Sequence, residues 1–337
     1  MVKSLVSIVV PVYQCETSIK RTIKALLAQT YRPLEIILVD DGSTDMSGII
    51  CDFYAEKYKE IRAFHQRHQG VSAARNLGIR EANGKYIQFT DADDEPMPKL
   101  IEELVKTLEA KQADMAVCNY EIIEANQIRK ECLSKEHKVL YRNRDDDVYF
   151  IFQKNVLSVT WNKLYQKDKI RHLYDETLIL CEDSVFCTRY FMDNHSVALC
   201  PCILYKYHNE TKKCNPRIQR IFGYPGIKKY LYCNWKLAGN IKDRVKRENC
   251  FQHIYKVFFY GVYTYIFEEA GRLGYKNPIA KYAVNTVIKD KLYQKVIRKI
   301  KHANMKERLY RFACVQQSFD LLSVELYVRE KLLFLFR

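Results

Sequence analysis

The chain has 337 residues, of which 48% are hydrophobic, so it can bury one large core or two smaller ones. This excludes a disordered chain and a collagen-like repeat. The net charge of +15 is uneven: 25 Lys and Arg stand against nine Asp and Glu from Arg217 onward, compared with 30 against 31 before it. We therefore expect two regions of different character, residues 1–215 and residues 216–337.

Nothing in the sequence predicts export or a membrane span. The apolar stretch Ile8 to Val12 is too short for the core of a signal peptide, and the uncharged run Val257 to Phe267 is too short to cross a bilayer. Twelve cysteines at irregular spacings, without paired CxxC motifs, indicate reduced thiols and neither disulfides nor a zinc site. We expect a cytoplasmic protein.

Short apolar strands alternate with helical periodicity in the N-terminal region, which predicts a parallel or mixed sheet covered by helices. Strands are expected at Val6–Val10, Leu34–Val39, Ile61–His65, Tyr86–Thr90 and Asp114–Glu121. Helices are expected at Ser18–Gln29, Ser47–Tyr58, Val71–Glu81 and Lys99–Lys111, with further helices between Asn143 and Arg189. Beyond Arg217 the sequence predicts long helices that are rich in basic and aromatic residues.

Acidic turns follow two of the expected strands. Asp40 and Asp41 end one strand, and Asp91 and Asp93 follow another. Ligands of an open α/β sheet sit beyond the carboxyl ends of its strands, so these turns should converge on one crevice. Asp91 and Asp93 could hold a hard divalent cation that bridges phosphates. The same residues could instead cap the helix expected near Pro98, and Asp40 and Asp41 could form an ordinary strand-to-helix turn.

Two further motifs could supply charged groups to the same crevice. Arg75 lies in the first turns of a helix that begins with small residues, where it could grip a phosphate or simply face solvent. Glu182 and Asp183 follow an apolar run, so one of them could point into the crevice as a general base while its neighbour points away. Alternatively, both complement the dipole of a helix start.

Five motifs occur in order: VSIVVPVY at 6–13, VDDGSTD at 39–45, GVSAARN at 70–76, DADD at 91–94 and ED at 182–183. Together they resemble glycosyltransferase family 2, over roughly the first two thirds of the chain. The resemblance implies an α/β fold of the GT-A type, with a mixed, mainly parallel sheet flanked by helices. It also implies Mn²⁺ or Mg²⁺ and a single displacement that inverts the anomeric carbon.

The family pattern also implies roles for individual residues. Asp91 and Asp93 would bind the metal, Asp183 would be the catalytic base, and Glu182 would orient the acceptor or support the loop. Contacts to the nucleotide would come from Pro11, Val12, Tyr13, Glu16, Asp40, Asp41, Arg75, Asp91 and Ala92.

Two looser segments, WNKLY at 161–165 and LYKYH at 204–208, are similar to those of bacterial members that build capsules and other surface polysaccharides. Many such members have Gly before the Glu-Asp pair, where this chain has Cys181. The resemblance implies transfer of a hexose or N-acetylhexosamine from a nucleotide diphosphate sugar, a UDP-sugar by analogy. The acceptor would be a hydroxyl of a lipid-linked saccharide.

The basic region 216–337 is predicted to be mainly α-helical. Ile288, Leu292, Val296 and Ile300 are four apart, which predicts one helical stripe surrounded by cations. A basic amphipathic helix of this kind often lies on an anionic membrane surface, so we expect docking on the inner face of the plasma membrane. A helical packing region with a solvated basic face, or a homodimer surface, is the alternative.

Three other functions compete with transfer. The basic pI of 9.1 suggests a nucleic-acid binder, but no such motif occurs and the excess charge lies outside the motif region, so we expect no nucleic acid. A sugar nucleotidyltransferase would want a Gly-rich phosphate loop after the first strand, where Pro11 to Glu16 has no glycine. A non-catalytic nucleotide-binding or membrane scaffold protein stays open as an alternative.

Overall fold

The computed structural model describes residues 3–124, 127–209, 221–274 and 277–301, together with Cys314 and Gln316. Contacts divide the chain into two compact units. The first comprises Met1–Thr177 and Glu182–Cys214, and the second comprises Leu178–Cys181 and Asn215–Arg337. The separate roles expected for residues 1–215 and 216–337 stay predictions.

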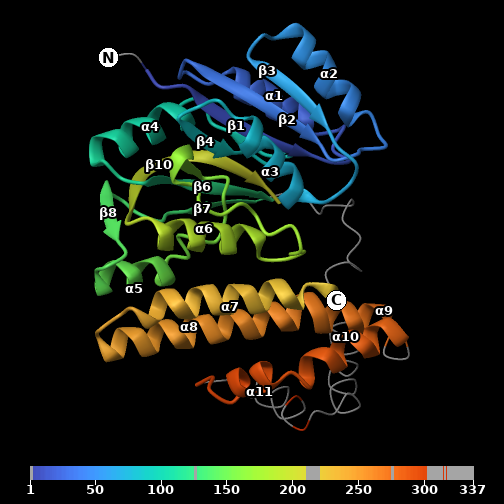
Figure 1. The fold of residues 1–337 in the computed structure, drawn as a ribbon, viewed down its shortest axis with the longest axis vertical. Coiled ribbons are helices and arrows are strands. Elements are labelled where there is room, and N and C mark those ends of the chain that lie inside the picture. The colour runs from blue at the N-terminus through green and yellow to red at the C-terminus, as the bar shows by residue number, and fades with distance from the viewer. Residues whose placement is uncertain are drawn as a thin grey trace. The chain divides into compact units, whose positions relative to one another are not determined.

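Ten strands of the described chain form one mixed sheet in the first unit (Figure 1). They are β1 (Val6–Val12), β2 (Leu34–Asp40), β3 (Ile61–His65), β4 (Tyr86–Phe89), β5 (Glu95–Pro96), β6 (Met115–Glu124), β7 (Gln127–Glu131), β8 (Lys138–Tyr141), β9 (Lys163–Gln166) and β10 (Ser196–His208). The order is β3-β2-β1-β4-β9-β6-β10-β5, with β7 beside β6 and β8 beside β10. The first four strands are parallel, and β9 runs antiparallel to both of its neighbours.

Helices cover both faces of this sheet, as the sequence predicted. They are α1 (Ile19–Leu27), α2 (Ser47–Lys57), α3 (Val71–Glu81), α4 (Leu100–Lys111), α5 (Asp145–Gln153) and α6 (Glu182–Asp193), with the short 3₁₀ helix η1 (Lys167–Lys169). Because side chains alternate along a strand, Ile8 and Val10 of β1 enter the core shared with α1, α2 and α4. Val9 faces α3 on the other side, where a Cβ at Gly78 would lie only 2.2 Å from it.

The parallel strands bring the sequence motifs to one edge. Val12 pairs with Asp40 in the β1–β2 register, and the amide of Asp41 donates to the Val12 carbonyl at 2.8 Å. On the other side of β1, Val9 pairs with Phe89, and Thr90 N donates to the Val9 carbonyl at 3.0 Å. The loops that follow β1, β2 and β4 therefore leave the sheet side by side.

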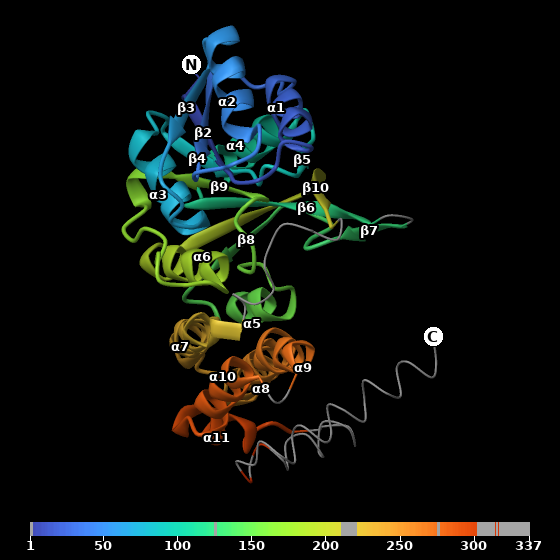
Figure 2. The same ribbon diagram turned by 90° about the vertical axis from the view of Figure 1, so that its right-hand side faces the viewer.

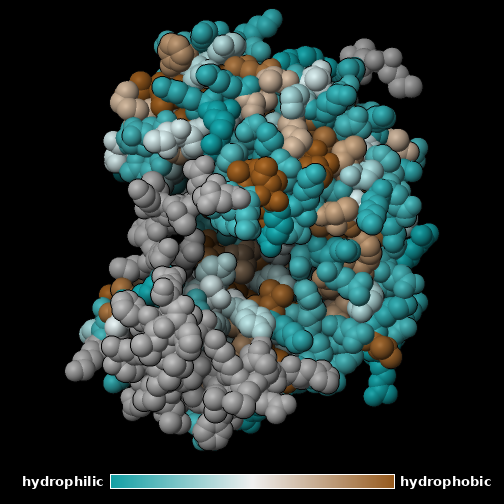
Figure 3. Space-filling model, turned by 180° about the vertical axis from the view of Figure 1, so that it is seen from behind, coloured by the Kyte–Doolittle hydropathy of each residue, from teal (hydrophilic) through white to brown (hydrophobic). Residues whose placement is uncertain are grey.

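The face of the first unit shown in Figure 3 is mainly hydrophilic, with hydrophobic side chains scattered among polar ones. Figure 2 shows β6 and β7 as a ribbon that extends away from the rest of the sheet. The side chains of β7 are almost all exposed. The core of this unit thus lies between the sheet and its helices, and β7 contributes little to it.

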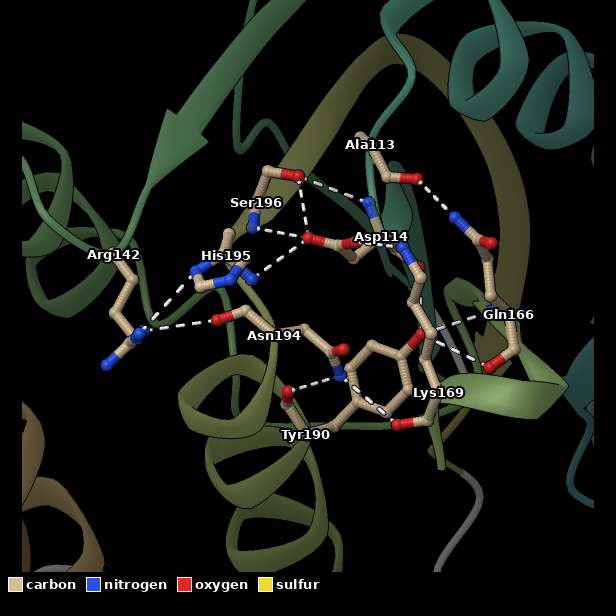
Figure 4. Close-up of polar contacts among 9 residues, drawn as sticks. All are labelled: Ala113, Asp114, Arg142, Gln166, Lys169, Tyr190, Asn194, His195 and Ser196. Atoms are coloured by element: carbon tan, nitrogen blue, oxygen red, sulfur yellow. Dashed lines mark hydrogen bonds and ion pairs between the residues drawn. The ribbon is translucent and has the colours of Figure 1, made fainter. Parts of the chain in front are cut away.

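A buried carboxylate joins the far end of α6 to the sheet (Figure 4). Asp114 Oδ2 accepts from the backbone amides of His195 and Ser196 at 2.9 and 2.8 Å, while Oδ1 lies 2.5 Å from Lys169 Nζ. The Tyr190 hydroxyl, from α6, donates to the Asp114 carbonyl at 2.8 Å. Burial alone would raise the pKa of Asp114, but Lys169 and the two amides outweigh it and hold that pKa below its usual value. Asp114 therefore anchors the helix whose first turn carries Glu182 and Asp183.

We expect Asp114→Asn to lower the free energy of unfolding by about 2–3 kcal/mol at pH 7. The asparagine side chain has one acceptor oxygen, so it cannot satisfy all the donors that contact the Asp114 carboxylate. A carboxyl whose pKa is depressed on folding stabilises the protein above its unfolded pKa and stops doing so as pH falls through the folded pKa. The gap between the wild type and the variant should therefore narrow as pH falls below the unfolded pKa of Asp114. Urea unfolding at pH 7 and pH 3 measures it, with the exposed Asp168→Asn as control; a gap as wide at pH 3 as at pH 7 would contradict this assignment.

The second unit is helical in its described part. It contains α7 (Tyr224–Gly239), α8 (Arg244–Val262), the π-helix η3 (Tyr263–Phe267), α9 (Glu268–Leu273), α10 (Pro278–Ile288) and α11 (Lys291–Ile297). Phe258 and Phe267 both contact the Tyr293 ring, with centroids 6.0 and 6.3 Å apart. These contacts give the unit an aromatic core. None of its described helices, nor any other in the described chain, is long and apolar enough to span a bilayer.

The single helical stripe expected at 288–300 is wrong. α10 ends at Ile288, and the Asp290 side chain accepts from the amides of Leu292 and Tyr293 to start α11, which ends at Ile297. Ile288, Val296 and Ile300 are buried. The apolar residues therefore build the core of the unit, as in the alternative of a packing region. The basic sequence from 302 to 337 lies outside the described residues except for Cys314 and Gln316.

Candidate functional site

The loop after β4 gathers three carboxylates. Oxygens of Asp91, Asp93 and Asp94 all lie within 4.8 Å of one another. Asp94 is fully buried and accepts from the Tyr205 hydroxyl at 2.9 Å and from the His208 amide at 3.0 Å. Burial, together with the charges of Asp91 and Asp93, raises the pKa of Asp94 well above its usual value. Asp94 thus fixes the loop against β10, while Asp91 and Asp93 remain partly accessible.

Arg75, from α3, pairs with carboxylates of two separate motifs. One terminal nitrogen lies 3.0 Å from Asp91 Oδ1, and the other lies 2.5 Å from Asp183 Oδ1. Its guanidinium also lies 5.2 Å from the centre of the Tyr174 ring. The Arg75 side chain is only 4% exposed. The structure places this arginine between the acidic loop and the expected base. Its expected contact with the nucleotide stays a prediction.

Glu182 and Asp183 form the first turn of α6, and both face Arg75. Glu182 Oε1 lies 3.5 Å from the guanidinium, so neither carboxylate points away from it, contrary to the expected alternation. The preceding Cys181 has φ of +63°, the left-handed region that favours glycine. Burial, followed by the charge of Asp183, raises the pKa of Glu182 to about 7. Burial also raises the pKa of Asp183, although Arg75 opposes the shift.

A carboxyl whose pKa is raised on folding stabilises the protein below its unfolded pKa and ceases to do so as pH rises through the folded value. The free energy of unfolding should therefore fall as pH rises from about 5 to 8 and Glu182 becomes charged. We expect Glu182→Gln to reduce the fall in Tm over this range by several degrees, because one pKa unit is about 1.4 kcal/mol. Thermal unfolding at pH 5.5 and pH 8 measures it. An unchanged difference in Tm would show that Glu182 titrates as it does in the unfolded chain.

The acidic turn after β2 is buried, and its two carboxylates contact neighbouring segments of the protein itself. Asp41 accepts from the amides of Gln69 and Gly70, both at 2.8 Å, and Asp40 pairs with His65 at 3.2 Å. Gly42 has φ of +73°, and a Cβ there would lie 2.8 Å from the His68 amide. Asp41 therefore holds the segment that leads into α3, and its carboxylate is buried beside the expected nucleotide position.

The residues after β1 lie beside this turn. The Tyr13 ring stacks on His68, with centroids 4.2 Å apart and planes at 19°, and both side chains are more than one third exposed. His68 Nδ1 also lies 2.9 Å from Asp41 Oδ2. Val12 is buried, and Glu16 accepts from the Met46 amide at the start of α2. Tyr13 and His68 thus form an aromatic surface at this edge, and His68 is a member that the sequence did not predict.

A divalent metal fits the carboxylate group at Asp91, Asp93 and Asp94. Hard cations take oxygen ligands, and this loop offers three closely spaced carboxylates. Ala92 contributes backbone and little side chain: its carbonyl accepts from the hydroxyls of Ser18 and Thr22, at 3.2 and 3.0 Å. The backbone of Ala92 therefore helps to hold the shape of the loop.

Comparisons with known proteins show what this chain is similar to in sequence and fold. Residues 7–195 match the family model described as Glycosyl transferase family 2. The chain is 32% identical to EpsH of Bacillus subtilis, a putative glycosyltransferase, over 67% of each chain. It is 34% identical to EpsJ of Bacillus subtilis, an uncharacterised glycosyltransferase, but the match spans only 60% of either chain. TarS 1–349 of S. aureus, solved in complex with UDP, superimposes with a TM-score of 0.65 at 16% identity, over 97% of this chain and 91% of that one.

Proposed function

The chain belongs to glycosyltransferase family 2, and we propose that it is a metal-dependent, inverting enzyme that moves a hexose or N-acetylhexosamine from a UDP-sugar to a saccharide hydroxyl. The observation that supports this best is the position of Arg75, which pairs with both Asp91 and Asp183. It links the expected metal ligands to the expected base through one side chain. The transfer chemistry is assigned to residues 1–215.

The acidic residues of the site would have separate roles in the transfer reaction. Asp91 and Asp93 would hold Mn²⁺ or Mg²⁺, which neutralises charge on a departing diphosphate. Asp183 would accept the proton of the acceptor hydroxyl as that oxygen attacks the anomeric carbon. Arg75 opposes the rise in the pKa of Asp183 that burial causes, and so favours the charged form of that carboxyl. Glu182, whose pKa of about 7 leaves it partly protonated at neutral pH, would orient the acceptor.

The nucleotide would lie along the loops after β1 and β2. Tyr13 and His68 offer an exposed aromatic surface on which a base can stack. Pro11, Val12, Asp40 and Glu16 would supply further contacts. Asp41 would receive a hydrogen bond from the base or the ribose. The UDP and UDP-GlcNAc complexes of TarS support a UDP-sugar as the donor.

The acceptor would be a lipid-linked saccharide in the synthesis of a bacterial capsule or another surface polysaccharide. The enzyme would then work at the inner face of the plasma membrane, docked by the region 216–337 or paired there as a homodimer. The exposed residues of α11 support electrostatic docking, because they are the cations Lys291 and Lys295, followed by Arg298 and Lys299. Sedimentation with anionic and neutral liposomes tests this: the wild type should bind only the anionic ones, and Lys291→Glu/Lys295→Glu should bind less.

The experiment that tests the proposed function is hydrolysis of UDP-, GDP- and dTDP-sugars by the purified chain with Mn²⁺. We expect slow release of one nucleotide, abolished by a chelator. If no nucleotide is released from any of these sugars and calorimetry detects no nucleotide binding, a scaffold protein would be favoured. Metal-dependent formation of a nucleotide sugar from a nucleoside triphosphate and a sugar phosphate would favour a nucleotidyltransferase.

A further inference from the structure

A second group of side chains able to bind a metal lies in the first unit, outside the acidic loop. It consists of Glu103 on α4 with Cys200 and Cys202 on β10, and the carboxylate oxygen and both sulfurs lie within 4.8 Å of one another. The proposed transfer chemistry uses none of these residues. The cysteines of the described chain are all free thiols, so neither sulfur is tied up in a disulfide.

The irregular course of β10 explains why these atoms meet. Its register with β6 shifts between Cys200 and Ile203, at the segment Cys200-Pro201-Cys202. On its other side, β8 pairs with Ser196–Leu199 and β5 with Tyr205 and Lys206, so the two cysteines fall between these pairings in the described chain. Cys200 is buried against α4, while Cys202 is partly exposed. The pair is thus anchored on one side and reachable from solvent on the other.

We propose that Glu103, Cys200 and Cys202 form a binding site for a thiophilic divalent cation of the Zn²⁺ class. Zn²⁺ takes thiolate and carboxylate ligands in tetrahedral sites, with about 2.3 Å to sulfur and about 2.0–2.2 Å to oxygen. Two sulfurs on one such ion lie about 3.8 Å apart, so the observed group needs only small side-chain adjustments. Three protein ligands leave a fourth position for water.

The chemistry of the ligands separates this site from the acidic loop. Mg²⁺ and Mn²⁺ prefer the carboxylate oxygens of Asp91 and Asp93, whereas sulfur ligands select softer ions. Binding would release the protons of both thiols to solvent as the two sulfur–metal bonds form.

An ion at this site would join α4 to β10 next to the acidic loop. The segment between that loop and α4 is already attached to the same strand, because the Met97 amide donates to the Leu204 carbonyl at 2.9 Å. Tyr205, which holds Asp94, is three residues beyond Cys202. The site would therefore stabilise the strand that supports the acidic loop without contributing a ligand to it.

The test is titration of the full reduced chain with Cd²⁺ in excess Mg²⁺, followed by the ultraviolet charge-transfer absorption of cadmium thiolate. We expect saturation at one ion per chain with the intensity of two thiolates. Cys202→Ser should lose most of this absorption, while the exposed Cys132→Ser control should keep it. Glu103→Gln should keep the absorption but weaken binding by at least about tenfold.

Thermal unfolding provides a readout that does not depend on the probe ion. A hundredfold excess of Zn²⁺ over its Kd should raise the Tm of the wild type and of Cys132→Ser by about 5 °C or more. The same excess should leave the Tm of Cys202→Ser almost unchanged. Absorption that survives in Cys202→Ser, disappears in Cys132→Ser or is absent from the wild type would overturn the assignment.

Discussion

Asp183→Asn is expected to reduce nucleotide release from the donor by about 10²- to 10⁴-fold in kcat, with little change in KM for that donor. The amide cannot accept a proton from the attacking hydroxyl, and Arg75 loses the partner that lies 2.5 Å away. Most of the proposed donor contacts lie on the loops after β1 and β2, so donor binding should survive. Initial rates at saturating and limiting donor separate the two effects, and thermal unfolding checks that the variant folds.

Asp193→Asn is a matched control for this substitution, because Asp193 ends the same helix and pairs with His172. Its kcat should stay within about twofold of the wild type, as for surface changes away from a site. Glu182→Gln should fall between the two. If Asp183→Asn keeps more than a tenth of the activity while Glu182→Gln loses it, the base is Glu182.

Asp93→Ala should weaken Mn²⁺ binding by at least about tenfold and reduce nucleotide release by at least about 10²-fold. Removing this carboxylate leaves Asp91, which pairs with Arg75, and Asp94, which is buried and accepts a hydrogen bond from Tyr205. Neither can replace it without giving up a structural contact. Calorimetry with Mn²⁺ in the absence of donor measures the affinity directly, independently of turnover.

The control for Asp93→Ala is Glu95→Gln, which removes a nearby carboxylate that pairs with Lys206 at 2.8 Å. Mn²⁺ affinity should be unchanged in this variant. Wild-type affinity in Asp93→Ala would mean that the ion is held by other groups, and the carboxylates at 91–94 would then serve mainly to shape the loop.

Local patterns in the sequence predicted most of the first unit. β3 and α3 begin and end at the expected residues, because apolar periodicity and the turn residues that flank it act over a few positions. The convergence of the turns after β1, β2 and β4 also followed, since parallel strands end at one edge. β10 was not predicted as a 13-residue strand, because its place depends on pairing with β6 about 80 residues earlier.

The partners of the site residues could not be predicted. Arg75 meets Asp183 across 108 positions, and Asp94 meets Tyr205 across 111, so neither contact leaves a periodic signal. The spacing of 288–300 was misleading for a different reason. The four-residue apolar repeat passes Asp290 without interruption. The Asp290 side chain nevertheless caps the start of a new helix, so the chain forms two helices where the repeat predicted one.

The shared guanidinium also has a consequence for how this sequence can vary. Positions 75, 91 and 183 form one electrostatic unit, so an uncharged residue at 75 would leave carboxylates facing one another with nothing between them. Lysine would not substitute well, because it offers a single point charge where two oxygens are held at once. In a library randomised at these three positions, clones that fold should therefore keep or exchange the charges together, and change at one position alone should be rare.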